Sequence, residues 1–67
     1  MEKLDVLKAI YLKGGVTLQS NFARDHSMYI AMLASQGLLT TFDGELYGNK
    51  WRVTFEGLLK LTEKGLV

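Results

Sequence analysis

The spacing of the apolar residues changes at Gly37. In residues 2–13 and 18–36 the apolar positions recur at intervals of three and four, as they do on one face of a helix. In residues 38–54 the period becomes two, which is typical of strands with one buried face. The helical interval returns in residues 55–63. The pattern therefore predicts an α+β fold, mostly α, in which helices are followed by an antiparallel β-hairpin and a final helix.

The first predicted helix has a buried face and a marked end. Its apolar face consists of Leu4, Val6, Leu7, Ile10 and Tyr11. Gly14 and Gly15 are expected to end it, because glycine tolerates the left-handed conformation that closes a helix. Leu12 points away from the apolar face and is a candidate contact in a dimer. Thr17 is expected to cap the helix that follows.

Two arrangements are compatible with residues 18–36, which contain no glycine or proline. In the first, one continuous helix covers the segment. In the second, the helix breaks near residues 25–27 and Ser27 caps a new helix. That new helix would bury Ile30, Leu33 and Ala34, and it would turn outward Met28, Ala31, Met32 and Ser35. Gly37 ends the segment in both arrangements.

The predicted hairpin carries two turn signals and three aromatic residues. Asp43–Gly44 predicts a type I′ turn, because both residue types tolerate positive φ, and Gly48–Asn49 predicts a second bend or bulge. Phe42, Tyr47 and Trp51 are expected to cover the core, with Trp51 largely buried. Thr54 is expected to cap the last helix, whose predicted buried residues are Phe55, Leu58, Leu59 and Leu61.

The composition limits what can stabilise this fold. The chain has 67 residues, no cysteine and one histidine, so disulfides and thiolate metal sites are excluded, and no metal or cofactor is expected. This length fits a single domain, residues 1–67, whose core contributes only about 3–5 kcal/mol. A homodimer is therefore expected. The longest apolar run, residues 28–34, is much shorter than the ~20 residues that span a bilayer, which favours a cytoplasmic protein without a membrane contact.

Two short strings carry a family resemblance. LASQGLLTT, at residues 33–41, contains Leu33, Gly37, Leu38 and Leu39, and WRVTFEGLLKL, at residues 51–61, contains Val53, Thr54 and Gly57. They resemble the winged helix-turn-helix regulators of the MarR and PadR kind. In that family, a leucine and a Gly-Leu-Leu step lead from the recognition helix into the wing, and a Val-Thr pair and a glycine lead from the wing into the final helix.

This resemblance covers roughly the whole chain, including the string GGVT at residues 14–17, and it implies a small winged-helix transcriptional regulator, of the size of a phage or plasmid protein. The sequence departs from the family in one respect. Gly37 follows Thr17 by only 20 positions, fewer than the family uses for two helices and a turn. One of the two helices is therefore expected to be short, unless the segment is a single helix.

We infer double-stranded DNA as the partner of such a domain, because a winged domain places a recognition helix in the major groove and its wing on phosphates. The candidate residues are Gln19, Ser20 and Arg24 on the entry helix, Ser27, Met28, Ala31 and Met32 on the groove side, and Lys50 and Arg52 on the wing. Asp43 and Glu45 at the hairpin turn oppose this function, because they repel phosphate.

The alternative is a winged-helix module that binds a protein, either a host factor or its own copy. Methionine-rich faces adapt to apolar partners, so the candidate interface residues are Leu12, Met28 and Met32. No arrangement of nucleophile, base or phosphate-binding loop suggests an enzyme. His26 is interpreted as a capping or half-buried side chain rather than a ligand.

Overall fold

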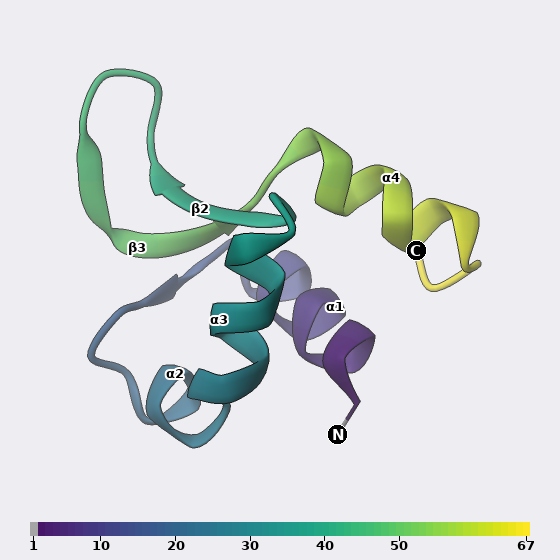
Figure 1. The fold of residues 1–67 in the computed structure, drawn as a ribbon, viewed down its shortest axis with the longest axis horizontal. Coiled ribbons are helices and arrows are strands. Elements are labelled where there is room, and N and C mark those ends of the chain that lie inside the picture. The colour runs from purple at the N-terminus through teal and green to yellow at the C-terminus, as the bar shows by residue number, and fades with distance from the viewer. Residues whose placement is uncertain (1) are drawn as a thin grey trace.

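The computed structural model describes residues 2–67. Within them, four helices and a three-stranded antiparallel sheet form a small, mostly helical α+β domain (Figure 1). The elements in chain order are α1 (Lys3–Lys13), β1 (Val16–Thr17), α2 (Asn21–Asp25), α3 (Ser27–Ser35), β2 (Leu39–Phe42), β3 (Tyr47–Val53) and α4 (Phe55–Glu63). The predicted α+β class, the hairpin and the final helix are confirmed.

The segment between Gly15 and Gly37 forms two helices, so the prediction of a break is confirmed and the continuous helix is wrong. The chain bends at His26, whose φ of −118° and ψ of 26° lie outside the helical range. Two predicted caps are wrong. Ser27 is the first residue of α3, and the N-cap position belongs to His26, whose side chain makes no capping bond. Thr17 lies in β1, and α2 is capped instead by Ser20, whose Oγ accepts the Ala23 N–H at 3.0 Å.

The sheet has the order β1-β3-β2, with β3 in the centre. The two-residue strand β1, which was not predicted, pairs with β3 through Val16 opposite Trp51 and Thr17 opposite Lys50. Strand β2 pairs Leu39 with Val53. Beyond the pair of Thr40 and Arg52 the register shifts, so that β3 contributes more residues than β2 before the hairpin turn. Gly48–Asn49 lies in this irregular part of β3, where the sequence predicted a bend or bulge.

The hairpin turn is not the predicted type I′ turn. Gly44 has a φ of 108°, but Asp43 has a negative φ, whereas a type I′ turn needs positive φ at both central residues. The Asp43 carboxylate shapes the loop instead: its Oδ1 accepts the backbone N–H groups of Leu46 at 3.1 Å and Glu45 at 3.2 Å. These hydrogen bonds, first that of Leu46, lower the pKa of the Asp43 carboxyl because they stabilise its charged form.

The core lies between α1, α3, α4 and the sheet, with α1 in contact with all three (Figure 1). The predicted burial of Ile30 and Leu33 is confirmed, and both Leu38 and Leu39 are buried beneath the hairpin. The buried apolar residues are Val6, Leu7, Ile10, Val16, Ala23, Ile30, Leu33, Leu38, Leu39 and Leu61.

The buried face of α4 differs from the predicted one. Thr54 caps the helix as expected, since its Oγ1 accepts the Gly57 N–H at 3.0 Å, and Leu61 is buried as expected. Phe55 is 70% exposed and Leu59 is 48% exposed, so the prediction that they are buried is wrong. The physical reason is that α4 turns Gly57 and Leu61 inward, and residues two positions away on a helix lie on nearly the opposite side.

The hairpin aromatics also differ from expectation. Trp51 packs against the core but is only half-buried. Phe42 and Tyr47 are exposed, and their rings pack against each other edge to face with centroids 5.2 Å apart. The prediction that all three cover the core is therefore wrong for Phe42 and Tyr47, because the hairpin extends them beyond the helices.

We expect Trp51→Ala to destabilise the protein by about 1–3 kcal/mol, less than the ~3–5 kcal/mol typical of a fully buried tryptophan. The half-buried indole removes less surface from water, and solvent can enter part of the space it leaves. Urea unfolding followed by circular dichroism measures the change. Tyr47→Ala is the matched control, since that side chain is 79% exposed, and its unfolding midpoint should stay near that of the wild type.

Candidate nucleic-acid interface

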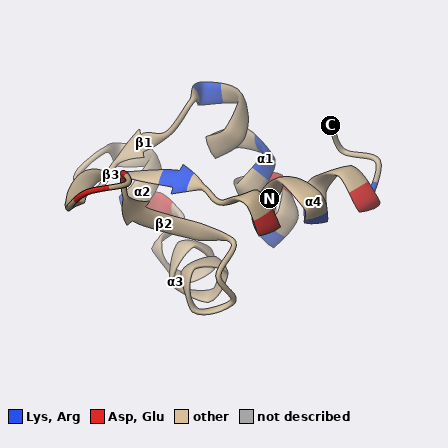
Figure 2. Cartoon of the chain, turned by 90° about the horizontal axis from the view of Figure 1, so that it is seen from above, with Lys and Arg blue, Asp and Glu red and all other residues tan. Residues whose placement is uncertain are grey.

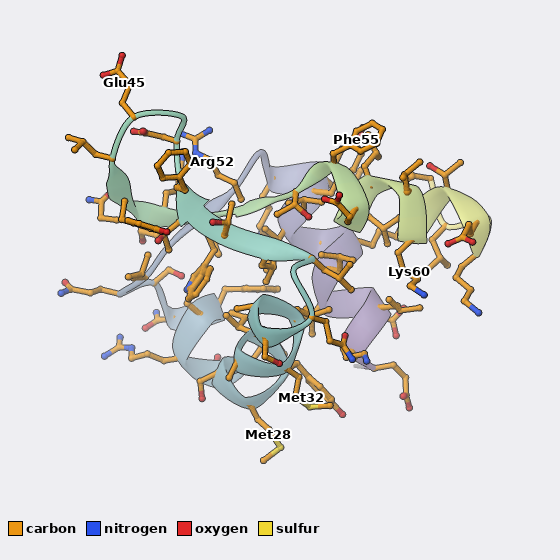
Figure 3. All side chains as sticks on the ribbon, turned by 45° about the horizontal axis from the view of Figure 1, so that its top comes forward. Met28, Met32, Glu45, Arg52, Phe55 and Lys60 are labelled. Carbon is orange, nitrogen blue, oxygen red and sulfur yellow. The ribbon has the colours of Figure 1, made fainter. Side chains whose placement is uncertain are left out.

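The outward face of α3 is the centre of the candidate site. Ser27, Met28, Ala31 and Met32 are all exposed there, while Ile30 and Leu33 on the opposite side enter the core. Met28 is 75% exposed and Met32 is 42% exposed, and Figure 3 shows both below α3, away from the rest of the fold. The residues divide into an edge of small side chains, Ser27 and Ala31, and an edge of methionines.

A shallow groove of about 390 Å³ runs between the α2–α3 pair and β3. It brings together three of the predicted site residues, Arg24, Ser27 and Ala31. Leu18 and Trp51 also line it, and the sequence did not identify them as site residues. Their apolar character was a signal for the core, and only the packing of β3 beside α3 places them at the edge of a groove.

The polar residues in α2 and just before it differ in exposure and in the hydrogen bonds that they make. Arg24 is exposed, and its Nη2 donates to Asn21 Oδ1 at 2.6 Å, which orients the guanidinium and leaves its other N–H groups for a ligand. Gln19 is exposed and lines a separate hollow with Asn49. Ser20 is half-buried and its hydroxyl caps α2, so its first role is structural.

Lys50 and Arg52 lie on the side of β3 opposite the groove, because side chains alternate along a strand and Trp51 between them faces the groove. The Lys50 carbon chain passes over Gly15, and Arg52 lines a hollow with Tyr11 and Gly15 at the end of α1. Arg52 is exposed, whereas Lys50 is half-buried. The structure therefore does not bring these two cations of β3 to the same groove as Arg24.

The hairpin turn between β2 and β3 carries the acidic residues that sequence analysis placed there. Asp43 and Glu45 are exposed, and Figure 2 shows this end of the hairpin in red. The attraction of Arg52 also lowers the pKa of the Asp43 carboxyl, after the larger effect of the backbone hydrogen bonds. At neutral pH the turn is negative and offers no contact to a phosphate.

Two other residues that the sequence analysis discussed, Leu12 and His26, also lie outside the groove. Leu12 is 68% exposed near the end of α1, whereas Met28 and Met32 belong to α3. His26 is half-buried, with its ring against that of Phe22 at a centroid distance of 4.6 Å. Among residues 2–67 no group of three His, Asp or Glu side chains could hold a metal ion.

Comparisons with protein-family models, with curated proteins and with solved structures found no match to this chain. In the part of the chain that the structure describes, no helix is both long enough and apolar enough to cross a membrane. The resemblance to MarR and PadR regulators therefore rests on the two short sequence strings alone.

Proposed function

We propose that this chain is a small winged helix-turn-helix regulator that binds double-stranded DNA with α3 in the major groove. The observation that carries the proposal is the exposed face of α3 next to Arg24, with α2 and the bend at His26 before it and an antiparallel hairpin after it. The order of helices and strands along the chain is compatible with a winged helix, in which the β2–β3 hairpin is the wing.

In this proposal the edge of α3 formed by Ser27 and Ala31 approaches the base edges, because small side chains allow the helix backbone close to the groove floor. The Ser27 hydroxyl can hydrogen-bond to a base, and Ala31 and Met28 can contact thymine methyl groups. None of these side chains makes the bidentate hydrogen bonds that give most base discrimination. Sequence specificity from α3 is therefore expected to be modest.

In this proposal the phosphate contacts come from Arg24 at the groove and from two cations on the outer side of β3. Arg24 is positioned on α2 beside α3, and Arg52 and Lys50 lie on the outer side of β3, where they can reach the neighbouring backbone strand. The acidic turn opposes these contacts, because Asp43 lies close enough to Arg52 for their charges to interact. A homodimer would double these contacts, and no cofactor is needed for them.

The salt dependence of binding tests the phosphate contacts. Lys50→Ala combined with Arg52→Ala should weaken binding to all duplex sequences and lower the slope of log K against log salt by about two, since each phosphate contact contributes about 0.9. Fluorescence anisotropy with a labelled random duplex measures the slope. Lys8→Ala combined with Lys13→Ala removes the same charge from α1 and is the matched control. A drop in slope only in this α1 variant would contradict the proposed orientation.

A second function, binding of a protein through α3, is favoured by one observation. Met28 and Met32 together expose a flexible apolar edge without any charged residue between them. Such an edge suits an apolar partner surface.

A further inference from the structure

A groove on the α1–α4 side of the molecule combines positive charge with an apolar floor. It has a volume of about 380 Å³ and is lined by Lys3, Leu4, Gln36, Leu38, Lys60 and Lys64. Lys3 Nζ donates to Gln36 Oε1 at 3.1 Å, which holds one ammonium group at the edge of the groove. No acidic residue lines it. We call this feature the lysine groove.

The hairpin tip, residues 43–46, has the complementary character. Asp43 and Glu45 are exposed, and Leu46 beside them is 72% exposed. The tip is preorganised, because Asp43 Oδ1 accepts two backbone N–H groups and the Asp43 N–H donates to Leu46 O at 3.0 Å. Little conformational entropy would be lost when such a loop binds.

We propose that the hairpin tip of one copy of this chain docks into the lysine groove of a second copy. Glu45 and Asp43 would lie against the ammonium groups of Lys60 and Lys64, and Leu46 would cover the apolar floor. This pairing matches both charge and apolar surface. A phosphate group would match only the charge and would leave the partly exposed Leu4 in contact with water.

The contact is between two different surfaces of the chain. Figure 3 shows Glu45 and Lys60 on opposite sides of the molecule, so a chain cannot fill its own groove with its own tip. Each contact therefore joins the tip of one copy to the groove of another copy. A tip of four residues buries much less than the ~1,200 Å² of a stable interface, so the association is weak. The proposal gives the acidic tip a role and does not depend on DNA binding.

Charge reversal of exposed residues tests the contact. Glu45→Lys on the tip and Lys64→Glu in the groove should each raise the dissociation constant of self-association about tenfold, because like charges then face each other. The double variant, Glu45→Lys with Lys64→Glu, has the net charge of the wild type and should restore association to about the wild-type level. An equimolar mixture of the two single variants should also associate. Glu63→Lys, an exposed acid outside the groove, is the control and should leave association unchanged.

Sedimentation equilibrium at up to about 1 mM protein in low salt measures these constants, since an interface of this size is weak and salt screens it. Backbone amide shifts on concentrating the wild type should change at residues 43–46 and around the lysine groove. Circular dichroism checks that each variant is folded. The proposal is overturned if the wild type stays monomeric at this concentration or if the double variant does not recover. It is also overturned if Lys64→Glu lowers only the affinity for DNA, which would make the groove a phosphate site.

Discussion

Gly57→Ala is expected to unfold a large part of the protein population at 25 °C. Gly57 lies where the first turn of α4 approaches Leu38, the residue before β2, and a Cβ added there would overlap the Leu38 carbonyl oxygen and lie 2.8 Å from Val53 Cγ1. Neither group can move easily. The Leu38 carbonyl accepts the Thr54 N–H at 3.0 Å, and Val53 pairs with Leu39 in the sheet. The added methyl group must therefore push α4 away.

Moving α4 would also break the hydrogen bonds that fix its start. Thr54 Oγ1 donates to Gly37 O at 2.7 Å and accepts the Gly57 N–H at 3.0 Å. Overpacking and the lost hydrogen bonds together cost about 3 kcal/mol or more. A domain of this size has a stability of only about 3–5 kcal/mol, so the loss approaches the whole stability.

Far-UV circular dichroism and urea titration of Gly57→Ala measure this effect. Gly48→Ala is the matched control, because its added Cβ would lie 3.5 Å from Thr41 O, an ordinary contact, and its φ is not in the left-handed region. The control should change the free energy of unfolding by about 1 kcal/mol at most. A Gly57→Ala variant with the unfolding midpoint of the wild type would show that α4 does not approach Leu38 this closely.

The parts of the fold that the sequence predicted are those with local signals. Gly37 has a φ of 77° and ends α3, Thr54 caps α4, and the period of two identifies β3. Each of these features depends on a few neighbouring residues. Strand β1 has no such signal, because its two residues become a strand only by pairing with Trp51 and Lys50, more than 30 positions later.

The orientation of α4 could not be predicted for a related reason. The sequence shows apolar residues around much of this helix, including Phe55, Leu58, Leu59 and Leu61, so the pattern does not choose one buried face. The close approach of Gly57 to Leu38 makes that choice, and Phe55 is left exposed. A glycine within an otherwise strong helical pattern is the one sequence signal for such a contact.

The candidate site was predictable in its central part and not in its surroundings. The outward set on α3 follows from helical periodicity once Ile30 and Leu33 are taken as core. The grouping of Arg24 with Trp51 in one groove, and the separation of Arg52 from it, depend on how β3 packs against α3. The lysine groove brings Lys3 together with Lys60 and Lys64, which follow it by more than 50 positions in the sequence. No local pattern predicts such a groove.

Met28→Glu combined with Met32→Glu is expected to reduce DNA affinity about 100-fold or more while the protein stays folded. Both side chains are exposed, so the substitutions place two carboxylates on the surface of α3 without disturbing the core. In the major groove these charges would face phosphates at short range and would leave polar groups poorly paired. Fluorescence anisotropy of DNA binding and sedimentation of the same variant should be measured together.

Two control variants are needed. One tests whether the loss of DNA affinity depends on where the charges are placed, and the other tests whether it depends on charge or on the loss of apolar side chains. Phe55→Glu with Leu59→Glu adds the same charge at two exposed apolar positions of α4 and should weaken DNA binding much less, because α4 does not line the α3 groove. Met28→Gln with Met32→Gln keeps the side-chain length without charge and should lower DNA affinity less than about tenfold.

If the methionine-to-glutamate variant keeps its DNA affinity but no longer associates with itself or a protein partner, then α3 is a protein interface. The exposed methionines would in that case contact apolar side chains of the partner.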